Sequence, residues 1–398
     1  MRRLSQRPTE DAFVQDPYPF YDRLRAAGPL VWWEEYGMPV AAGMEAVTAI
    51  LKDRRFGREG PAAPVPGHLA PWQAIEDHSM LELDPPRHTR LRALVARAFT
   101  SRAAQRLAPG LEALCRDLAD RFPEGTFDLL PAYAQPIPAV TIARLLGVPE
   151  EDVPDLLRWS HAMVGMYQAG RDRAAEDAAA RASVEFAAYL RAAIASRRAA
   201  PRDDLLSELV AARDGADRLS EEELISTAVL LLNAGHEATV HAIGLGAARL
   251  LARRPEPGAD LDALVEEALR HDPPLHLFTR RAAERLTLHG HRFEAGDPVA
   301  CLLGAANRDP AAFARPGAFD PARPAAFHAA FGAGIHFCVG AALARLELRI
   351  ALGVLLERRP PLRVVRPPRL APIYHFHGLE ALWVGVPAPD HRPGAREG

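Results

Sequence analysis

Cysteine is scarce in this chain of 398 residues, which contains only Cys115, Cys301 and Cys338. The number is odd, the three residues lie far apart, and no Cys-x-x-Cys pair occurs. This pattern excludes a disulfide framework and a cysteine-rich zinc cluster as the basis of the fold. It is typical of a protein from a reducing compartment, so we expect a cytoplasmic location.

A large excess of charge of one sign is also missing. The formal net charge is −3, and almost all basic residues are arginine, with Lys52 as the only lysine. No global electrostatic field therefore favours a polyanion, and we expect no nucleic-acid partner.

Long uninterrupted apolar runs are missing as well. The arginines at the N-terminus are followed by no apolar stretch, so we expect neither a signal peptide nor a membrane anchor. The most apolar segment, residues 225–252, contains Asn233, His236 and Glu237. A bilayer would penalise these side chains, so we expect a buried helix in a soluble protein and no membrane partner.

The spacing of apolar residues predicts a mainly α fold with small β-sheets, forming a single domain over residues 1–398. The length would also allow two or three domains, but no linker and no internal repeat occurs. Helices are predicted at residues 17–28, 43–53 and 84–100, and for most of 101–255. Strands are predicted as a hairpin in residues 30–43 with its turn at Gly37, in 286–307, and as a terminal hairpin in 373–386. Residues 57–82 are predicted as a long loop and about 387–398 as a disordered tail.

Two helix starts carry capping residues. Asp84 is a candidate N-cap before two prolines in a first turn. Ser220 and Glu223 have the spacing of a capping box. From Ser220 to Arg254 a helix would span about 50 Å, which makes it the longest element of the chain.

Cys338 lies in a glycine-rich segment directly before a predicted helix that begins near Val339. A helix N-terminus favours the thiolate, the form that ligates a metal or attacks an electrophile. Gly332 and Gly334 allow the backbone to pass close to a flat or bulky group, and Gly340 allows a tight entry into the helix. Three interpretations remain open at this point: a buried structural cysteine, a nucleophile paired with His336, and the axial ligand of a haem.

The complete segment resembles the haem-binding loop of the cytochrome P-450 family, the haem-thiolate monooxygenases. The matching positions are Phe331, Gly332, Gly334, His336, Cys338 and Gly340. The resemblance implies the cytochrome P-450 fold, with a long central helix over haem b. It also implies that Cys338 is the axial thiolate, that Phe331 packs beside its sulfur, and that His336 points to a haem propionate.

The resemblance implies roles for two further groups of residues. Glu267 and Arg270, three apart on a helix, would form with Arg323 a structural network that supports the cysteine side of the haem. Taken alone, His88 and Arg92 are more simply a solvated basic face. The resemblance instead implies that these two bind the propionates, together with Arg280, which fits the family pattern better than Arg281.

The oxygen chemistry would lie in the middle of the long helix. The resemblance implies that Gly235 opens space for dioxygen and that Glu237 feeds protons. The family usually has threonine directly after the acid, whereas this chain has Ala238 there and Thr239 one position later. Ala238 is therefore a departure at the position that normally steadies the bound oxygen, and His241 is a candidate replacement.

The resemblance implies a monooxygenase that hydroxylates or otherwise oxidises a small organic molecule, and the departure at Ala238 leads us to expect an oxygenated substrate whose own hydroxyl or carbonyl completes the proton relay with Glu237. Its substrate would contact the long helix, residues 60–82 and Leu275–Phe278. NAD(P)H would act only indirectly, through a ferredoxin reductase and a ferredoxin, and we expect a monomer. A basic patch of Arg90, Arg97, Arg345 and Arg349 would receive the ferredoxin. The alternatives are a peroxide-driven or non-hydroxylating haem-thiolate enzyme, and a haem-binding sensor or carrier without turnover.

Overall fold

The computed structural model describes residues 1–60, 64–98, 101–167, 171–213, 217–374 and 376–386. Its helices are α1 (Asp11–Gln15), α2 (Tyr18–Ala27), α3 (Met44–Lys52), α4 (Ala70–Glu76), α5 (Arg87–Ala98), α6 (Ser101–Arg106), α7 (Ala108–Asp120), α8 (Pro136–Leu146), α9 (Val153–Val164), α10 (Arg173–Ala199), α11 (Leu205–Ala211), α12 (Glu221–Ala252), α13 (Leu261–His271), α14 (Leu303–Ala306) and α15 (Ala341–Glu357). The predicted mainly α architecture is confirmed.

The strands are short. They are β1 (Arg3–Leu4), β2 (Val31–Trp33), β3 (Met38–Ala41), β4 (Phe56–Gly57), β5 (Thr126–Asp128), β6 (Leu277–Ala282), β7 (Leu286–Leu288), β8 (His291–Phe293), β9 (Pro298–Leu302), β10 (Arg363–Val364), β11 (Arg369–Leu370), β12 (Leu379–Ala381) and β13 (Trp383–Gly385). The largest sheet has the order β1-β2-β3-β9-β6-β4, so it joins strands of the first 57 residues to strands of residues 277–302. Its β1–β2 and β3–β9 pairs are parallel and the others antiparallel.

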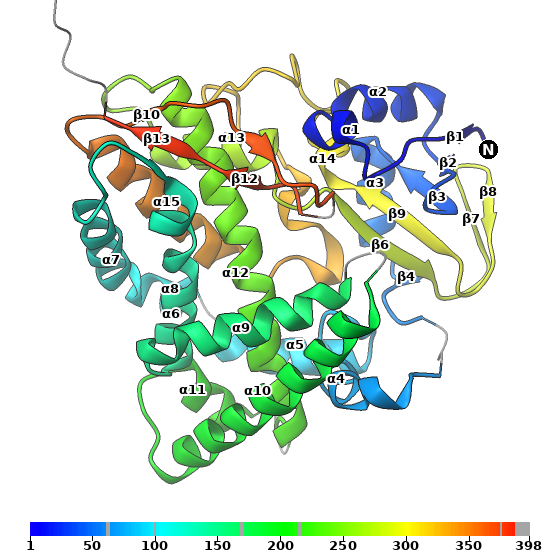
Figure 1. Cartoon of the computed structure of the whole chain (residues 1–398). Helices are drawn as coiled ribbons and strands as arrows, with labels where there is room; N and C mark the ends of the chain where they lie inside the picture. The colour runs from blue at the N-terminus through cyan, green and yellow to red at the C-terminus, as the bar shows by residue number, and fades with distance from the viewer. Residues whose placement is uncertain (61–63, 99–100, 168–170, 214–216, 375, 387–398) are drawn as a thin grey trace, which may run out of the picture.

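Helix α12 organises the helical part of the molecule. Figure 1 shows it running through the centre, with α15 beside it and the six-stranded sheet on the other side of the view. The predicted capping box is present, because the Ser220 hydroxyl accepts from the Glu223 N–H and the Glu223 carboxylate accepts from the Ser220 N–H. The helix contributes to both large hydrophobic clusters, with Ile225 and Leu232 in one and Ile243 and Leu250 in the other. This double packing holds the middle of α12 rigidly inside the protein.

Four local predictions are wrong. Residues 57–82 are not simply a loop, since they contain a 3₁₀ turn (Gly67–Leu69) and α4. Strand β5 interrupts the predicted run of helices. The terminal hairpin does not form, because β12 pairs with β11 whereas β13 pairs with β10 and β5. Asp84 does not cap α5 with its side chain, since that carboxylate accepts from the backbone N–H groups of Arg58 and Glu59.

The first helix and the hairpin around Gly37 lie close to their expected positions. The strands predicted in 286–307 are present as β7, β8 and β9 up to Leu302, but the end of that range forms the short helix α14. Residues 387–398, predicted as a tail, lie outside the described residues. Within the described ranges, no helix is both long and apolar enough to cross a membrane.

Candidate functional site

The loop around Cys338 is folded back on itself before α15 begins. It contains two 3₁₀ turns, Ala329–Phe331 and Gly334–His336, and the Cys338 N–H donates to the Phe331 carbonyl at 3.0 Å. Gly334 has a φ of 73°, and a Cβ there would overlap the Leu51 carbonyl oxygen of α3. Only glycine fits this position, because both the backbone conformation and the close approach exclude a side chain.

Gly340 plays a different part from the predicted one. Its φ is −82°, which other residues adopt readily, so no special backbone freedom is needed at the entry to α15. The atom nearest to a Cβ at this position would be the Cys338 Sγ, 3.8 Å away. The absence of a side chain therefore keeps the surroundings of the sulfur open.

The Cys338 side chain is exposed, whereas Cys115 and Cys301 are buried, and all three have free thiols. Desolvation by the surrounding loop raises the pKa of the Cys338 thiol, against the lowering effect of the Gly340 N–H and of the charges on Arg92 and Arg345. The expected preference for the thiolate is thus outweighed in the protein alone. A coordinated metal ion reverses this balance, since it deprotonates a bound thiol outright.

A group of basic side chains lies beside this loop. The ring of His88, from α5, lies 4.2 Å from the ring of His336. Burial, together with the nearby charges of His336, Arg92 and Arg280, lowers the pKa of His88 to about 4, and the charge of Asp84 opposes this only in part. The structure therefore brings together the four side chains that the resemblance assigned to the propionates.

These basic side chains have few hydrogen-bond acceptors and anionic partners around them. Neither ring nitrogen of His88 has a hydrogen-bond partner among the described residues, although the side chain is buried. Burial, with a smaller contribution from the charge of Arg58, lowers the pKa of Arg280, on β6, to about 10. Among the described residues, Arg92 donates to the backbone carbonyl of Phe337, and Arg280 donates to that of Thr279. Neither guanidinium is paired with a carboxylate there, and the buried His88 has no partner, so this cluster is suited to an anionic ligand.

Sequence reasoning missed one acidic member of the cluster. Asp84 Oδ1 lies 3.6 Å from His336 Nε2. The two residues are far apart in the chain, and no local pattern relates them. Although Asp84 supplies the orienting acid that a nucleophilic cysteine–histidine pair needs, the described residues show no hydrogen bond between His336 and Cys338. The arrangement favours a ligand-binding cysteine over a nucleophile.

Glu267, Arg270 and Arg323 form a buried network below the loop. Arg270 binds Glu267 through two hydrogen bonds of 2.7 and 2.8 Å, and Arg323 Nε lies 3.5 Å from Glu267 Oε2. Arg270 also donates to the backbone carbonyls of Asn307, Pro316 and Ala318. The network thus fixes the segment that leads to the cysteine loop. Phe331 lies in that loop, with the Arg345 guanidinium 4.5 Å above its ring.

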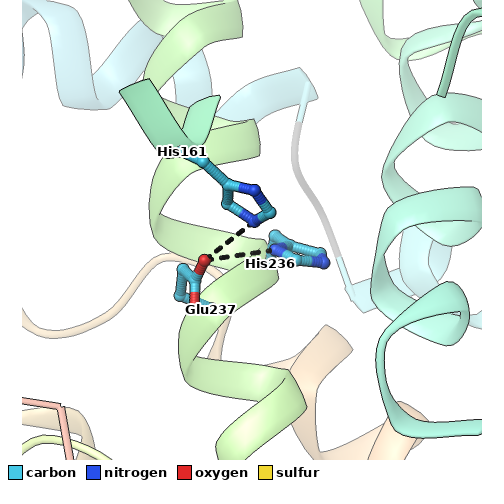
Figure 2. Close-up of side chains that lie close together, drawn as sticks. All are labelled: His161, His236 and Glu237. Carbon is cyan, nitrogen blue, oxygen red and sulfur yellow. Dashed lines mark ion pairs between the residues drawn. The ribbon is translucent and has the colours of Figure 1, made fainter. Parts of the chain in front are cut away.

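The middle of α12 presents Glu237 to two histidines. Glu237 Oε1 lies 3.0 Å from His161 Nε2 of α9 and 3.9 Å from His236 Nδ1, as Figure 2 shows. Burial raises the pKa of the Glu237 carboxyl, but the hydrogen bond from His161 and the neighbouring imidazoles lower it more, so the net shift is downward. Glu237 is therefore ionised at neutral pH and can accept a proton from its neighbours. Sequence reasoning gave no signal for His161, which comes from a different helix.

Gly235 does not open the helix. α12 is continuous across this position, and a Cβ on Gly235 would lie 2.8 Å from Ile142 Cδ1 of α8. The glycine instead allows α8 to approach closely. Ala238 is half-buried and Thr239 is buried. His241 Nε2 lies 3.6 Å from Glu237 Oε2, so this histidine is part of the same polar group.

In the segment predicted to contact substrate, Leu275–Phe278, the side chains of His276 and Phe278 lie in different surroundings. His276 is buried in an aromatic cluster, where its Nδ1 lies 2.8 Å from the Tyr21 hydroxyl and its ring stacks on His377. Phe278 instead lies against Gly332, with a ring carbon 3.5 Å from where a Cβ would be. Of these two aromatic side chains, Phe278 is the one beside the cysteine loop.

The predicted basic docking patch is largely ion-paired within this protein, and ferredoxin docking on it stays a prediction. Three of its arginines are paired with acids: Arg90 with Asp217 and Glu223, Arg345 with Glu266, and Arg349 with Asp262. The fourth, Arg97, donates to the carbonyl of Arg213. The sequence did not reveal these acids, which come from other segments.

Comparisons with known proteins agree with this geometry. The family described as Cytochrome P450 matches residues 261–359. The chain is 41% identical to cytochrome P450 monooxygenase PikC of Streptomyces venezuelae, over 93% of this chain and 91% of the relative. It is 39% identical to the mycinamicin IV hydroxylase/epoxidase of Micromonospora griseorubida, over 80% of this chain and 81% of the relative.

A solved structure has the same fold. The crystal structure of P450BioI in complex with an acyl carrier protein ligated to hexadec-9Z-enoic acid superposes with a TM-score of 0.88 at 35% identity, covering 95% of this chain and 99% of that one. The chain therefore belongs to the cytochrome P-450 family, in its bacterial form. As a member it is a haem-containing oxidoreductase, a monooxygenase that incorporates molecular oxygen and is served by redox partners.

Proposed function

We propose that this protein is a haem b monooxygenase that hydroxylates or otherwise oxidises a small, oxygenated organic substrate. Its electrons would come singly from a ferredoxin, reduced by a ferredoxin reductase at the expense of NAD(P)H. The observation that carries the proposal is the exposed Cys338 thiol beside buried basic groups that lack acceptors. These are the two chemical requirements of a haem, a soft ligand for iron and cations for two propionates.

Each residue of the site has a part in this proposal. Cys338 would hold the iron, with Phe331, Gly332 and Gly340 shaping the space around the sulfur. His88, Arg92, Arg280 and His336 would bind the propionates. When bound, the haem supplies the activation of dioxygen, and the protein holds it, tunes it and excludes side reactions. Glu267, Arg270 and Arg323 would keep the loop in place.

Proton delivery is assigned to Glu237, with His161 and His241 in contact with its carboxylate. Ala238 cannot donate or accept a hydrogen bond through its side chain. Thr239 is displaced by about 100° around the helix, so its hydroxyl does not replace one at residue 238. A hydroxyl or carbonyl of the substrate, or a water that it holds, would complete the relay with Glu237.

This relay is the reason for expecting an oxygenated substrate, such as a steroid, terpenoid or polyketide-like molecule. Support comes from a relative whose name describes it as a mycinamicin IV hydroxylase/epoxidase. The proposal also includes a single domain over residues 1–398, a monomeric state, a cytoplasmic location, and no nucleic-acid or membrane partner. Ferredoxin docking is proposed on the cysteine side of the haem, through Arg90, Arg97, Arg345 and Arg349, three of which also pair with acids of this chain.

The test is the optical spectrum of the reduced protein with carbon monoxide. Thiolate ligation by Cys338 should give a strongly red-shifted Soret band, and Cys338→Ala should abolish it while Cys301→Ala should leave it in place. Wild-type protein that takes up no haem would refute the proposal. Product formation with a ferredoxin system, compared with peroxide as the only oxidant, distinguishes the monooxygenase from a peroxide-driven enzyme and from a carrier without turnover.

A further inference from the structure

Three potential metal ligands meet where α9 crosses α12. His161 comes from α9, and His236 and Glu237 are neighbours on α12. Their donor atoms all lie within 4.8 Å of one another. Figure 2 shows both imidazoles directed towards the Glu237 carboxylate, one from each helix.

His236 is the member that points to a missing ligand. Its side chain is 3% exposed, and neither of its ring nitrogens has a hydrogen-bond partner in the described parts of the chain. A buried imidazole without partners loses the hydrogen bonds that water would give it. A metal ion bound to Nδ1 would satisfy this side chain, whereas the existing distance of 3.9 Å to Glu237 is too long for a hydrogen bond.

The other two donors are accessible from outside. His161 is 53% exposed and Glu237 22% exposed, so an ion can reach them without the protein unfolding. The distance of 3.0 Å between His161 Nε2 and Glu237 Oε1 is close to the separation of neighbouring ligands around a tetrahedral ion. Around Zn²⁺, with bonds of about 2.0–2.1 Å, that separation is roughly 3.4 Å. The distance of 3.9 Å between His236 Nδ1 and Glu237 Oε1 is longer than this separation, so small rotations of both the Glu237 carboxylate and the exposed His161 would bring all three donors into range.

We propose that His161, His236 and Glu237 form a binding site for a transition-metal dication, with Zn²⁺ as the ion that the donors suit best. Two imidazoles and a carboxylate are borderline ligands that zinc accepts in tetrahedral sites. Water would occupy the fourth position, on the side where His161 is exposed. The site is distinct from the Cys338 loop, which shares none of these ligands.

Occupation of the site would have two effects. It would join α9 to α12 by metal bonds, in place of the single hydrogen bond between His161 and Glu237. It would also engage the carboxylate to which proton delivery is assigned, so zinc would inhibit turnover reversibly. This second effect rests on the proposed function, whereas metal binding itself does not.

The test is equilibrium dialysis of tag-free, haem-loaded protein against Zn²⁺, with bound zinc counted. His161→Ala should weaken binding at the site at least about tenfold, since even supporting residues around a metal cost 10–100-fold when removed. The matched control is His68→Ala, because His68 lies 2.8 Å from Glu176 in a similar His–Glu pair. It should leave the affinity unchanged. Volume-conserving His236→Gln should weaken binding as His161→Ala does.

Equal zinc affinity in wild type, His161→Ala and His68→Ala would overturn the site. His161 is half-exposed, so its removal leaves the core intact and the comparison remains valid if His236→Gln does not fold. The carbon monoxide spectrum of each sample reports the haem separately. A protein that binds zinc as expected but has no thiolate-ligated haem would refute the proposed function and leave the metal site standing.

Discussion

Glu347 offers a sharp test of how this fold tolerates a buried acid. The residue lies on α15, is 2% exposed, and its Oε1 has no hydrogen-bond partner within the described part of the chain. Burial raises the pKa of this carboxyl from 4.5 to about 8, and a hydrogen bond with Thr141 offsets only part of the effect. We predict that Glu347→Gln stabilises the protein in alkaline solution.

The sign follows from proton binding. Between pH 4.5 and about 8 the folded protein keeps a proton on Glu347, whereas the unfolded chain has released it. The contribution of this group to stability is therefore fully present below pH 4.5 and is lost as the pH rises through about 8. Each pH unit in this interval lowers the free energy of unfolding by about 1.4 kcal/mol, or about 5 kcal/mol in total.

The assay is urea-induced unfolding of the haem-loaded protein across this range of pH. Wild type and Glu347→Gln should have similar stability near the acid end, where both side chains are neutral, and should diverge steadily above it. Glu357→Gln is the matched control, because Glu357 lies on the same helix with 62% of its side chain exposed. A constant difference between wild type and Glu347→Gln at all pH values would refute the reasoning.

Two further predictions concern the site. With Ala238 in place, product formed per NAD(P)H consumed should be high only for substrates that carry the hydroxyl or carbonyl near the reacting carbon, and Ala238→Thr should partly restore coupling with analogues that lack it. Equal coupling for a matched substrate pair in the wild type would show that the protein supplies the whole relay. Gly334→Ala should reduce stability by about 1–3 kcal/mol and lower haem content, because of its positive φ and the contact with the Leu51 carbonyl. Gly317→Ala, where nothing lies within 4 Å of a Cβ, should change neither quantity.

The parts of the fold that the sequence predicted well depend on local patterns. The capping box at Ser220 and the long apolar periodicity that follows it locate α12 within two residues at its C-terminal end. By contrast, α4 has only seven residues and is held by packing against α10 and α12, which no local pattern predicts. The terminal hairpin was wrong in its pairing: β12 and β13 pair with β11 and β10, just upstream of the predicted segment, and β13 also pairs with the distant β5, which no local pattern predicts.

The candidate site also has a part that the sequence predicted from a local pattern and a part that it did not predict. The cysteine loop could be located because its residues are contiguous and each glycine is placed at a fixed offset from Cys338. The pairing of His336 with Asp84, and of Glu237 with His161, depends on how separate helices and loops pack. The sequence also did not reveal that three of the four proposed docking arginines, Arg90, Arg345 and Arg349, pair with acids. Contacts between distant segments are set by tertiary packing, and they decide the electrostatics of the site.

The order of strands in the largest sheet constrains how the chain is made. β3 pairs with β9 in parallel, and the two strands are separated by about 260 residues. At a synthesis rate of about 5–20 residues per second, β3 leaves the ribosome roughly 13–50 s before its partner exists. During that time β1, β2 and β3 can pair with one another, but the edge of β3 that β9 later covers stays open. An unpaired strand edge can pair with other chains, so completion of this sheet during synthesis protects the protein from aggregation.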